Sequence, residues 1–88
     1  MDSFKLVWKQ SAIKELKNLD KTVVQRIISS VEKLQKQPYP KGCKKLRGAE
    51  YTYRLKVGNY RIIYSVYKRT LVIEIVKVGH RKSVYRNK

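Results

Sequence analysis

The sequence has 88 residues, of which 42% are hydrophobic and 10% aromatic, enough for one domain with a small core. Twenty-two Lys and Arg residues against six Asp and Glu residues give a formal net charge of +16, and this composition is not that of a disordered chain. The apolar runs are far shorter than the ~20 residues that a membrane helix needs, and no apolar signal segment opens the chain. We therefore expect a single cytoplasmic domain over residues 1–88.

The positive charge is concentrated in the second half of the chain. Residues 1–40 contain eight cations and four acids, a net +4, whereas residues 41–88 contain fourteen cations and two acids, a net +12. A chain this basic is expected to bind a polyanion or an acidic protein, mainly through its C-terminal half. A generally basic soluble surface would have the same composition, so charge alone does not decide the partner.

The cysteine and histidine content excludes two kinds of site. Cys43 is the only cysteine, which rules out an internal disulfide, and His80 is the only histidine, which leaves no zinc-binding pattern. We interpret Cys43 as a loop residue rather than a catalytic thiol, because no histidine is close to it in sequence. No metal or other cofactor is expected.

The first part of the chain predicts one strand and two helices. Residues 4–8 are β-prone, residues 11–19 predict a helix with Ser11 as its N-cap, and Asp20 predicts the N-cap of a longer helix that ends before Pro38. Because Asp20 also joins the helices, they should form a tight hairpin. Apolar residues recur at helical spacing in both helices: Ala12, Ile13, Leu16 and Leu19 in the first, and Val24, Ile27, Ile28, Val31 and Leu34 in the second.

Three strands are predicted after a loop over residues 37–50. Residues 51–57 and 60–67 alternate in polarity around Gly58-Asn59, a pair typical of a hairpin turn. The nearly continuous apolar run over 71–78 indicates a strand in the middle of the sheet. The expected fold is α+β with the order β-α-α-β-β-β, a helical hairpin packed on one face of a mainly antiparallel sheet. The tyrosines at positions 51, 53 and 64 are expected in the core.

The uncovered face of this sheet is expected to carry the functional surface. Arg54 and Lys56 on one hairpin strand and Arg61 on the next point away from the helices, because strand residues two apart share a face. Gly79-His80-Arg81 leaves the last strand, and we expect it near the same surface.

The ordered motifs of the second half resemble the RelE branch of the RelE/ParE superfamily of bacterial and archaeal toxins. They are Leu46-Arg47-Gly48 with Tyr51, Tyr53-Arg54-Leu55, Gly58-Asn59-Tyr60-Arg61, and Val78-Gly79-His80-Arg81 with Val84-Tyr85. The resemblance covers nearly the whole chain and implies a RelE-like microbial ribonuclease-type fold. It also implies the toxin of a type II toxin–antitoxin system, a metal-independent mRNA interferase that cleaves mRNA in the ribosomal A site and inhibits translation. The implied partners are mRNA, the 30S ribosome and a short, acidic, partly disordered antitoxin in a higher-order complex.

The resemblance also implies the residues of the site. Metal-free RNA cleavage uses the 2′-hydroxyl of the substrate, so it needs a base, an acid and cations around the phosphate. The expected catalytic residues are Arg54, Arg61, His80, Arg81 and Tyr85; the expected contacts with RNA and the ribosome are Lys44, Lys45, Arg47, Lys56 and Lys82. Histidine titrates nearest neutrality, and Tyr85 would act as a base or stack on the RNA. Thr52 stands where the best-known member has a lysine proposed to transfer protons, which leaves the general base open.

Two other functions remain compatible with the sequence. A ParE-like protein of the same fold inhibits DNA gyrase by binding, although ParE-like chains lack the nuclease residues that Arg61, His80, Arg81 and Tyr85 match. A non-catalytic RNA-binding protein is the second alternative, but no RNA-binding signature of another fold is present.

Overall fold

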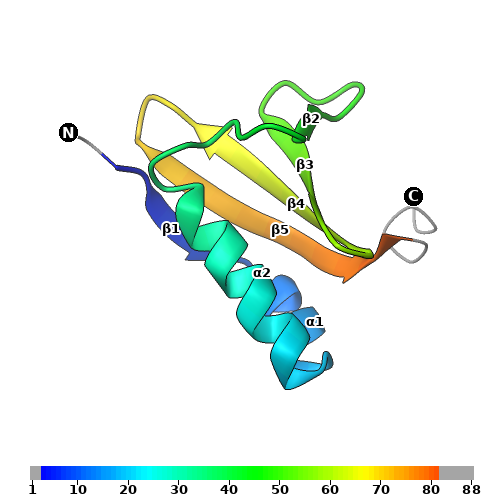
Figure 1. Cartoon of the computed structure of the whole chain (residues 1–88). Coiled ribbons are helices and arrows are strands. Elements are labelled where there is room, and N and C mark those ends of the chain that lie inside the picture. Colours follow the sequence, from blue (N-terminus) through cyan, green and yellow to red (C-terminus); the bar gives the residue numbers. More distant parts are fainter. Residues whose placement is uncertain (1–2, 82–88) are drawn as a thin grey trace.

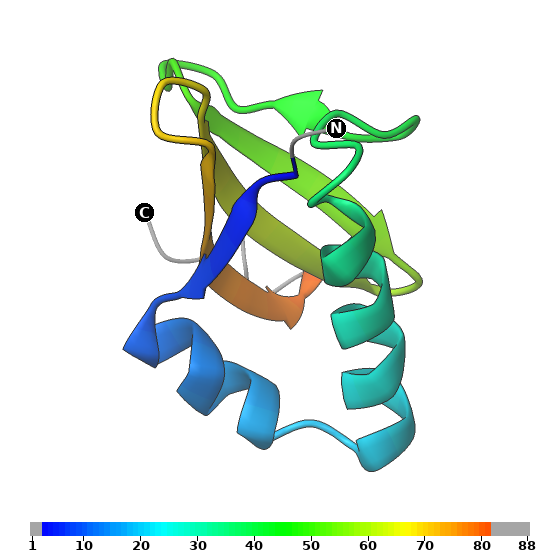
Figure 2. The ribbon, with the colours of Figure 1, turned by 90° about the vertical axis from the view of Figure 1, so that its left-hand side faces the viewer.

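The computed structural model describes residues 3–81. The elements are β1 (Lys5–Trp8), α1 (Gln10–Lys17), α2 (Lys21–Lys33), β2 (Lys44–Lys45), β3 (Thr52–Val57), β4 (Tyr60–Tyr67) and β5 (Val72–His80). The strands form one sheet in the order β1-β5-β4-β3-β2, in which β1 runs parallel to β5 and the other neighbours are antiparallel. The two helices lie on one side of this sheet (Figures 1 and 2). The predicted α+β fold is confirmed.

Two details of the sheet differ from the prediction. The short edge strand β2 lies in a segment that we expected to be a loop. The apolar run in β5 is an internal strand, but the centre of the sheet is β4, where six consecutive residues from Arg61 to Val66 are buried. Within residues 3–81, no helix combines the length and the apolar character needed to cross a bilayer.

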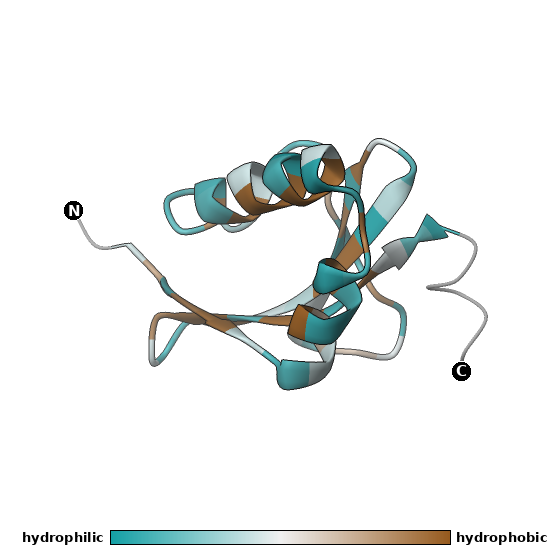
Figure 3. Ribbon diagram, turned by 90° about the horizontal axis from the view of Figure 1, so that it is seen from below, coloured by the Kyte–Doolittle hydropathy of each residue, from teal (hydrophilic) through white to brown (hydrophobic). Residues whose placement is uncertain are grey.

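The core lies between the helices and the sheet. Ile27, Val31 and Leu34 at the predicted apolar face of α2 are fully buried, and they pack in one cluster with Ile62 and Tyr64 of β4. In Figure 3 the brown, hydrophobic parts of the helices face the interior. Each such aliphatic side chain contributes about 1.5–3 kcal/mol when it is buried, so this packing decides which face of the sheet stays free of helices.

The helices begin differently from the way the cap residues predict. Ser11 is not the N-cap of α1: the N-cap is Lys9, whose N–H donates to the carbonyl oxygen of Ile75 at 3.0 Å. The strand pairing thus extends to Lys9, and the chain turns directly into the helix with Ser11 already inside it. Asp20 is the N-cap of α2, as predicted, but its side chain makes no capping hydrogen bond.

An irregularity in β5 changes which residues face the helices. The register opposite β4 shifts between Ile63, which pairs with Lys77, and Tyr64, which pairs with Ile75, so Val76 is an extra residue in β5. Ile73 and Ile75 face the core before this β-bulge, and Val78 faces it afterwards. Strict alternation would have placed Val78 on the opposite face. The bulge therefore reverses which side chains at the end of β5 face the helices.

Candidate functional site

Cations gather on the helix-free face of the sheet, near the β3–β4 turn. Cross-strand pairing places Lys56 opposite Arg61, and Arg61 opposite Gly79. Arg54 is two residues from Lys56 on the same face, and Lys44 of the edge strand pairs with Arg54. Lys44 and Lys56 are exposed, whereas Arg54 is half-buried. The predicted grouping of Arg54, Lys56 and Arg61 on one face is therefore present in the fold, and Lys44 lies beside Arg54.

Arg61 is the most buried cation of this group, with a relative exposure of 7%. Its Nη1 donates hydrogen bonds to the carbonyl oxygens of Gly58 at 3.1 Å and Tyr60 at 3.0 Å. A buried charge is tolerated when it is hydrogen-bonded in this way. Because Gly79 has no side chain, no side chain of β5 lies directly opposite Arg61. The guanidinium is thus held at one orientation at the turn.

The β3–β4 turn is fixed from several sides. Gly58 has a φ of +60°, as the first central residue of a type II′ turn requires, and Val57 pairs with Tyr60 across the turn. The N–H of Arg81 donates to the carbonyl oxygen of Asn59 at 2.9 Å, which ties the chain after β5 to the turn. Figure 1 shows the end of β5 beside this turn. The backbone of Arg81 and the side chain of Arg61 thus meet at one turn.

The segment that contains His80 ends beside the turn, but the side chain of His80 lies on the helix side of the sheet. It is the last residue of β5 and pairs with Tyr60, and the two rings make an edge-to-face contact with centroids 5.6 Å apart. Tyr60 packs against the core, so His80 shares the helix side of the sheet while Arg61 and Gly79 lie on the other. The β-bulge at Val76 places His80 and Arg61 on opposite faces of the sheet, and no local sequence pattern predicts this bulge.

Thr52 has a structural partner on the same face as Arg54. Its hydroxyl lies 3.0 Å from the hydroxyl of Ser65 on β4, and Ser65 is 5% exposed. A hydroxyl group remains protonated near neutral pH, so this pair is suited to hydrogen bonding and not to general-base catalysis.

Other predicted residues lie away from this group or cannot be placed. Lys45 pairs with Tyr53, and Arg47 follows in an exposed loop, so both lie toward the far end of β3 from Lys56. Lys82 and Tyr85 fall outside the described residues.

The tyrosines of the described residues differ in burial: Tyr53 and Tyr60 pack partly buried against the core, one tyrosine is fully buried and the others are exposed. Tyr64 is fully buried as predicted, donates to the carbonyl oxygen of Pro38 at 2.7 Å, and burial strongly raises the pKa of its phenol. Tyr51 was wrongly assigned to the core: it precedes β3 at the end of the hairpin and is 55% exposed. Its ring contacts Tyr67. The hairpin register set by Gly58-Asn59 would have revealed this proximity, because it places Tyr51 beside the end of β4.

Comparison with known proteins agrees with this fold. A family model described as ParE toxin of type II toxin-antitoxin system, parDE, matches residues 6–85. Toxin RelE3 of Methanocaldococcus jannaschii is 32% identical over 85 residues, which cover 92% of this chain and 94% of that protein. RelE in the archaeal RelE–RelB complex of Pyrococcus horikoshii superposes with a TM-score of 0.81 at 30% identity, over 90% of this chain and 96% of that chain.

The bacterial proteins give the same result. The intact RelBE toxin–antitoxin complex of Escherichia coli matches with a TM-score of 0.79 at 26% identity, over 89% of this chain and 96% of that chain. The family model matches most of the sequence, and the relative and the two solved structures named above are all described as RelE or RelE complexes. This chain therefore belongs to the RelE-type toxins of the RelE/ParE superfamily, whose members are the toxins of type II toxin–antitoxin systems.

Proposed function

We propose that this chain is a ribosome-dependent endoribonuclease that cleaves mRNA in the A site without a metal ion, and so inhibits translation. The observation that supports this most is the group of Arg54, Lys56 and Arg61 on one sheet face, beside the turn that binds the backbone of Arg81. The reaction is the one expected from the family, and we propose that the phosphate binds at this group of cations.

The reaction would proceed by transfer within the RNA. A base removes the proton of the 2′-hydroxyl, the oxygen attacks the adjacent phosphorus, and the bond to the 5′-oxygen breaks as that oxygen takes up a proton. The products are a 2′,3′-cyclic phosphate and a 5′-hydroxyl. Negative charge builds up on the phosphate oxygens in the transition state, so the guanidinium groups of Arg61 and Arg81 would lower the barrier.

Arg61 is suited to this role because its orientation is set before substrate arrives. Its Nη1 is engaged with two turn carbonyls, so a two-point contact with phosphate would come from Nε and Nη2. Arg54 and Lys56 would orient the neighbouring phosphates. Arg81 is exposed and its position depends on the hydrogen bond from its backbone to Asn59.

The proposed proton-transfer groups are His80 and Tyr85. His80 would reach a phosphate held by Arg61 only around the end of the sheet, because the two side chains leave opposite faces. Tyr85 is the other proposed base. The hydroxyl of Thr52 is hydrogen-bonded to the hydroxyl of Ser65, and a threonine hydroxyl does not act as a base near neutral pH.

The proposed partners follow from charge and from the relatives. RelE of P. horikoshii and of E. coli was solved in complex with RelB, and we propose that a short acidic antitoxin likewise neutralises this chain in a higher-order complex. The proposed ribosome and mRNA contacts include Lys44 beside Arg54, the more distant Lys45 and Arg47, and Lys82.

A ParE-type activity is the second candidate, because the matching family model is described as a ParE toxin. Such a protein would inhibit DNA gyrase by binding and would cut no RNA. Both candidates predict growth arrest and an antitoxin, so toxicity alone does not separate them, and a direct cleavage test is needed.

The test is primer extension on a defined message, with and without programmed ribosomes, using purified protein that has first been treated with EDTA and freed of the chelator. Cleavage that requires ribosomes, is undiminished in the EDTA-treated protein and leaves a 2′,3′-cyclic phosphate is the expected result. Cleavage of free RNA would remove the ribosome from the proposal. Intact message in every reaction with folded protein, together with inhibited gyrase supercoiling, would establish the ParE-type function instead.

A further inference from the structure

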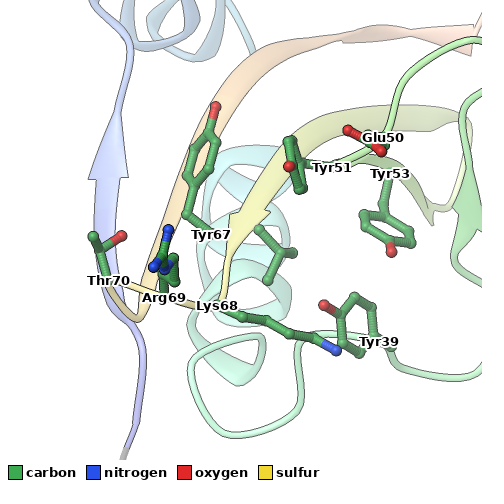
Figure 4. Close-up of a pocket in the computed structure, with 9 residues that line it drawn as sticks. Tyr39, Glu50, Tyr51, Tyr53, Tyr67, Lys68, Arg69 and Thr70 are labelled. Carbon is green, nitrogen blue, oxygen red and sulfur yellow. The ribbon is translucent and has the colours of Figure 1, made fainter.

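A pocket that the proposed cleavage site does not use lies at the opposite end of the β3–β4 hairpin. Its volume is about 490 Å³, within the range of small-molecule sites. It is bordered by the end of β4, the residues before β3 and the loop after α2 (Figure 4). Tyr67 at this end is six residues from Arg61 along β4, a separation of about 20 Å.

Four of the nine residues that line this pocket are tyrosines: Tyr39, Tyr51, Tyr53 and Tyr67. Their rings are arranged in two pairs, with centroids 5.0 Å apart for Tyr39 and Tyr53 and 5.9 Å apart for Tyr51 and Tyr67. Tyr51 is 55% exposed, and Tyr39 and Tyr67 are each 38% exposed. Large aromatic rings with this much free surface contribute little to the core and offer faces on which a flat ligand can stack.

Charged groups surround these rings. Lys68 Nζ lies over the ring of Tyr39, 5.4 Å from its centroid, and Arg69 follows it in the same turn. Glu50 lies at the pocket beside Tyr51 and Tyr53 (Figure 4). The pocket therefore combines aromatic faces with cations on one side and a single hydrogen-bond-accepting carboxylate on another.

We propose that this pocket binds an unpaired nucleotide of single-stranded RNA, with its base stacked on Tyr51 and a phosphate held by Lys68 and Arg69. Aromatic faces next to cations are the combination that binds single-stranded nucleic acid regardless of sequence. The choice of RNA as ligand rests on the proposed nuclease function.

Glu50 favours a base over an acidic peptide as the occupant. A carboxylate accepts hydrogen bonds from the amino groups of bases, whereas it repels the acidic side chains of an antitoxin. The distance from Arg61 means that the pocket would hold RNA away from the cleaved bond. It would act as a second anchor for the strand and would not be part of the catalytic group.

The test is the affinity of the purified chain for a labelled 2′-O-methyl oligonucleotide, measured by fluorescence anisotropy. This ligand cannot be cleaved through a 2′-hydroxyl, so binding is measured apart from catalysis. Tyr51→Ala should weaken binding about 5- to 150-fold, the value of one base–aromatic stack, whereas Tyr51→Phe should bind like the parent. Lys68→Ala should weaken binding more than Lys14→Ala, which removes the same charge from an exposed position on α1.

Equal binding by the parent and Tyr51→Ala would overturn the proposal, as would equally weak binding by Tyr51→Phe and Tyr51→Ala. Ultraviolet crosslinking to a halogenated-uracil oligonucleotide, with peptide mapping, needs no substitution; crosslinks at Tyr51 or Tyr67 are expected, and crosslinks elsewhere only would contradict it. If Tyr51→Ala weakens the antitoxin complex but not oligonucleotide binding, the pocket is a protein contact. If the message stays uncut while oligonucleotide binding depends on Tyr51, the RNA site stands without the nuclease.

Discussion

The side chain of Arg61 has a structural role in the turn, and we propose that it also has a functional one. It is buried and donates to two carbonyl groups of the turn, and in the proposed mechanism it also contacts the phosphate. Arg81 differs, because its side chain is exposed and only its backbone N–H holds the turn. The two arginines should therefore respond differently to substitution.

Arg61→Ala should lower both cleavage and stability. The rate is expected to fall about 10²–10³-fold through loss of transition-state stabilisation. The free energy of unfolding should fall by about 1–3 kcal/mol, because two turn carbonyls lose their buried donor. Arg81→Ala should lower the rate alone. Single-turnover cleavage on ribosomes and urea unfolding measure the two effects, and equal stability of the two variants would contradict the structural role of Arg61.

At the level of the strands, the part of β5 that extends beyond β1 forms hydrogen bonds to the side chain of Glu15. β1 pairs with β5 over Lys5–Trp8, and farther along β5 the carboxylate of Glu15 on α1 accepts from the N–H of Val78 at 2.8 Å and from Lys77 Nζ at 3.1 Å. Glu15 thus replaces the missing strand partner of β5, next to the end that carries Gly79 and His80.

Glu15→Ala should destabilise the fold by about 1–3 kcal/mol, since Val78 loses its acceptor. Lys77→Ala should cost at most about 1 kcal/mol, because that ion pair is roughly one-third exposed on both sides. Urea unfolding gives both values, and hydrogen exchange of the Val78 amide should quicken only in Glu15→Ala. A larger effect of Lys77→Ala would show that the ion pair matters more than the edge hydrogen bond.

Tyr64 links the central strand to the loop after α2. Its phenol donates to Pro38, and removal of the hydroxyl in Tyr64→Phe should cost about 1 kcal/mol. Burial raises the pKa of Tyr64 above the value of about 10 in the unfolded chain. The stabilisation that the buried, protonated Tyr64 provides is therefore complete below pH ~10, and it is lost as the pH rises further. Stability measured against pH should fall more steeply above this value in the parent than in Tyr64→Phe; parallel curves would contradict the shift.

At the scale of the whole molecule, charge should control association with RNA. The net charge of +16 includes +12 in residues 41–88, which contain β2 to β5. The logarithm of the binding constant for single-stranded RNA should fall linearly with the logarithm of the salt concentration. Lys56→Ala should reduce the magnitude of this slope by about 0.7 if Lys56 contacts a phosphate. Lys14→Ala on α1 is the matched control, and equal slopes for the two variants would exclude that contact.

Local sequence patterns alone predict the fold class and most of the helices and strands. The apolar face of α2, the alternation in residues 51–57 and the Gly58-Asn59 turn are local patterns, and each produced the element it predicted. The same alternation placed Arg54, Lys56 and Arg61 on one face, because a hairpin with a two-residue turn fixes its own register.

The tertiary structure decided what depends on contacts between distant segments. Val76 forms a bulge only against β4, and this moved His80 to the face opposite Arg61. Arg61 acquired its two carbonyl partners from the turn geometry, and Tyr51 became exposed because it lies at the end of the hairpin. The pocket of tyrosines joins the segments around Tyr39, Tyr51 and Tyr67, which no local period connects. Local periodicity specifies the face of a residue within an element, but only packing specifies where elements end and what lies across from them.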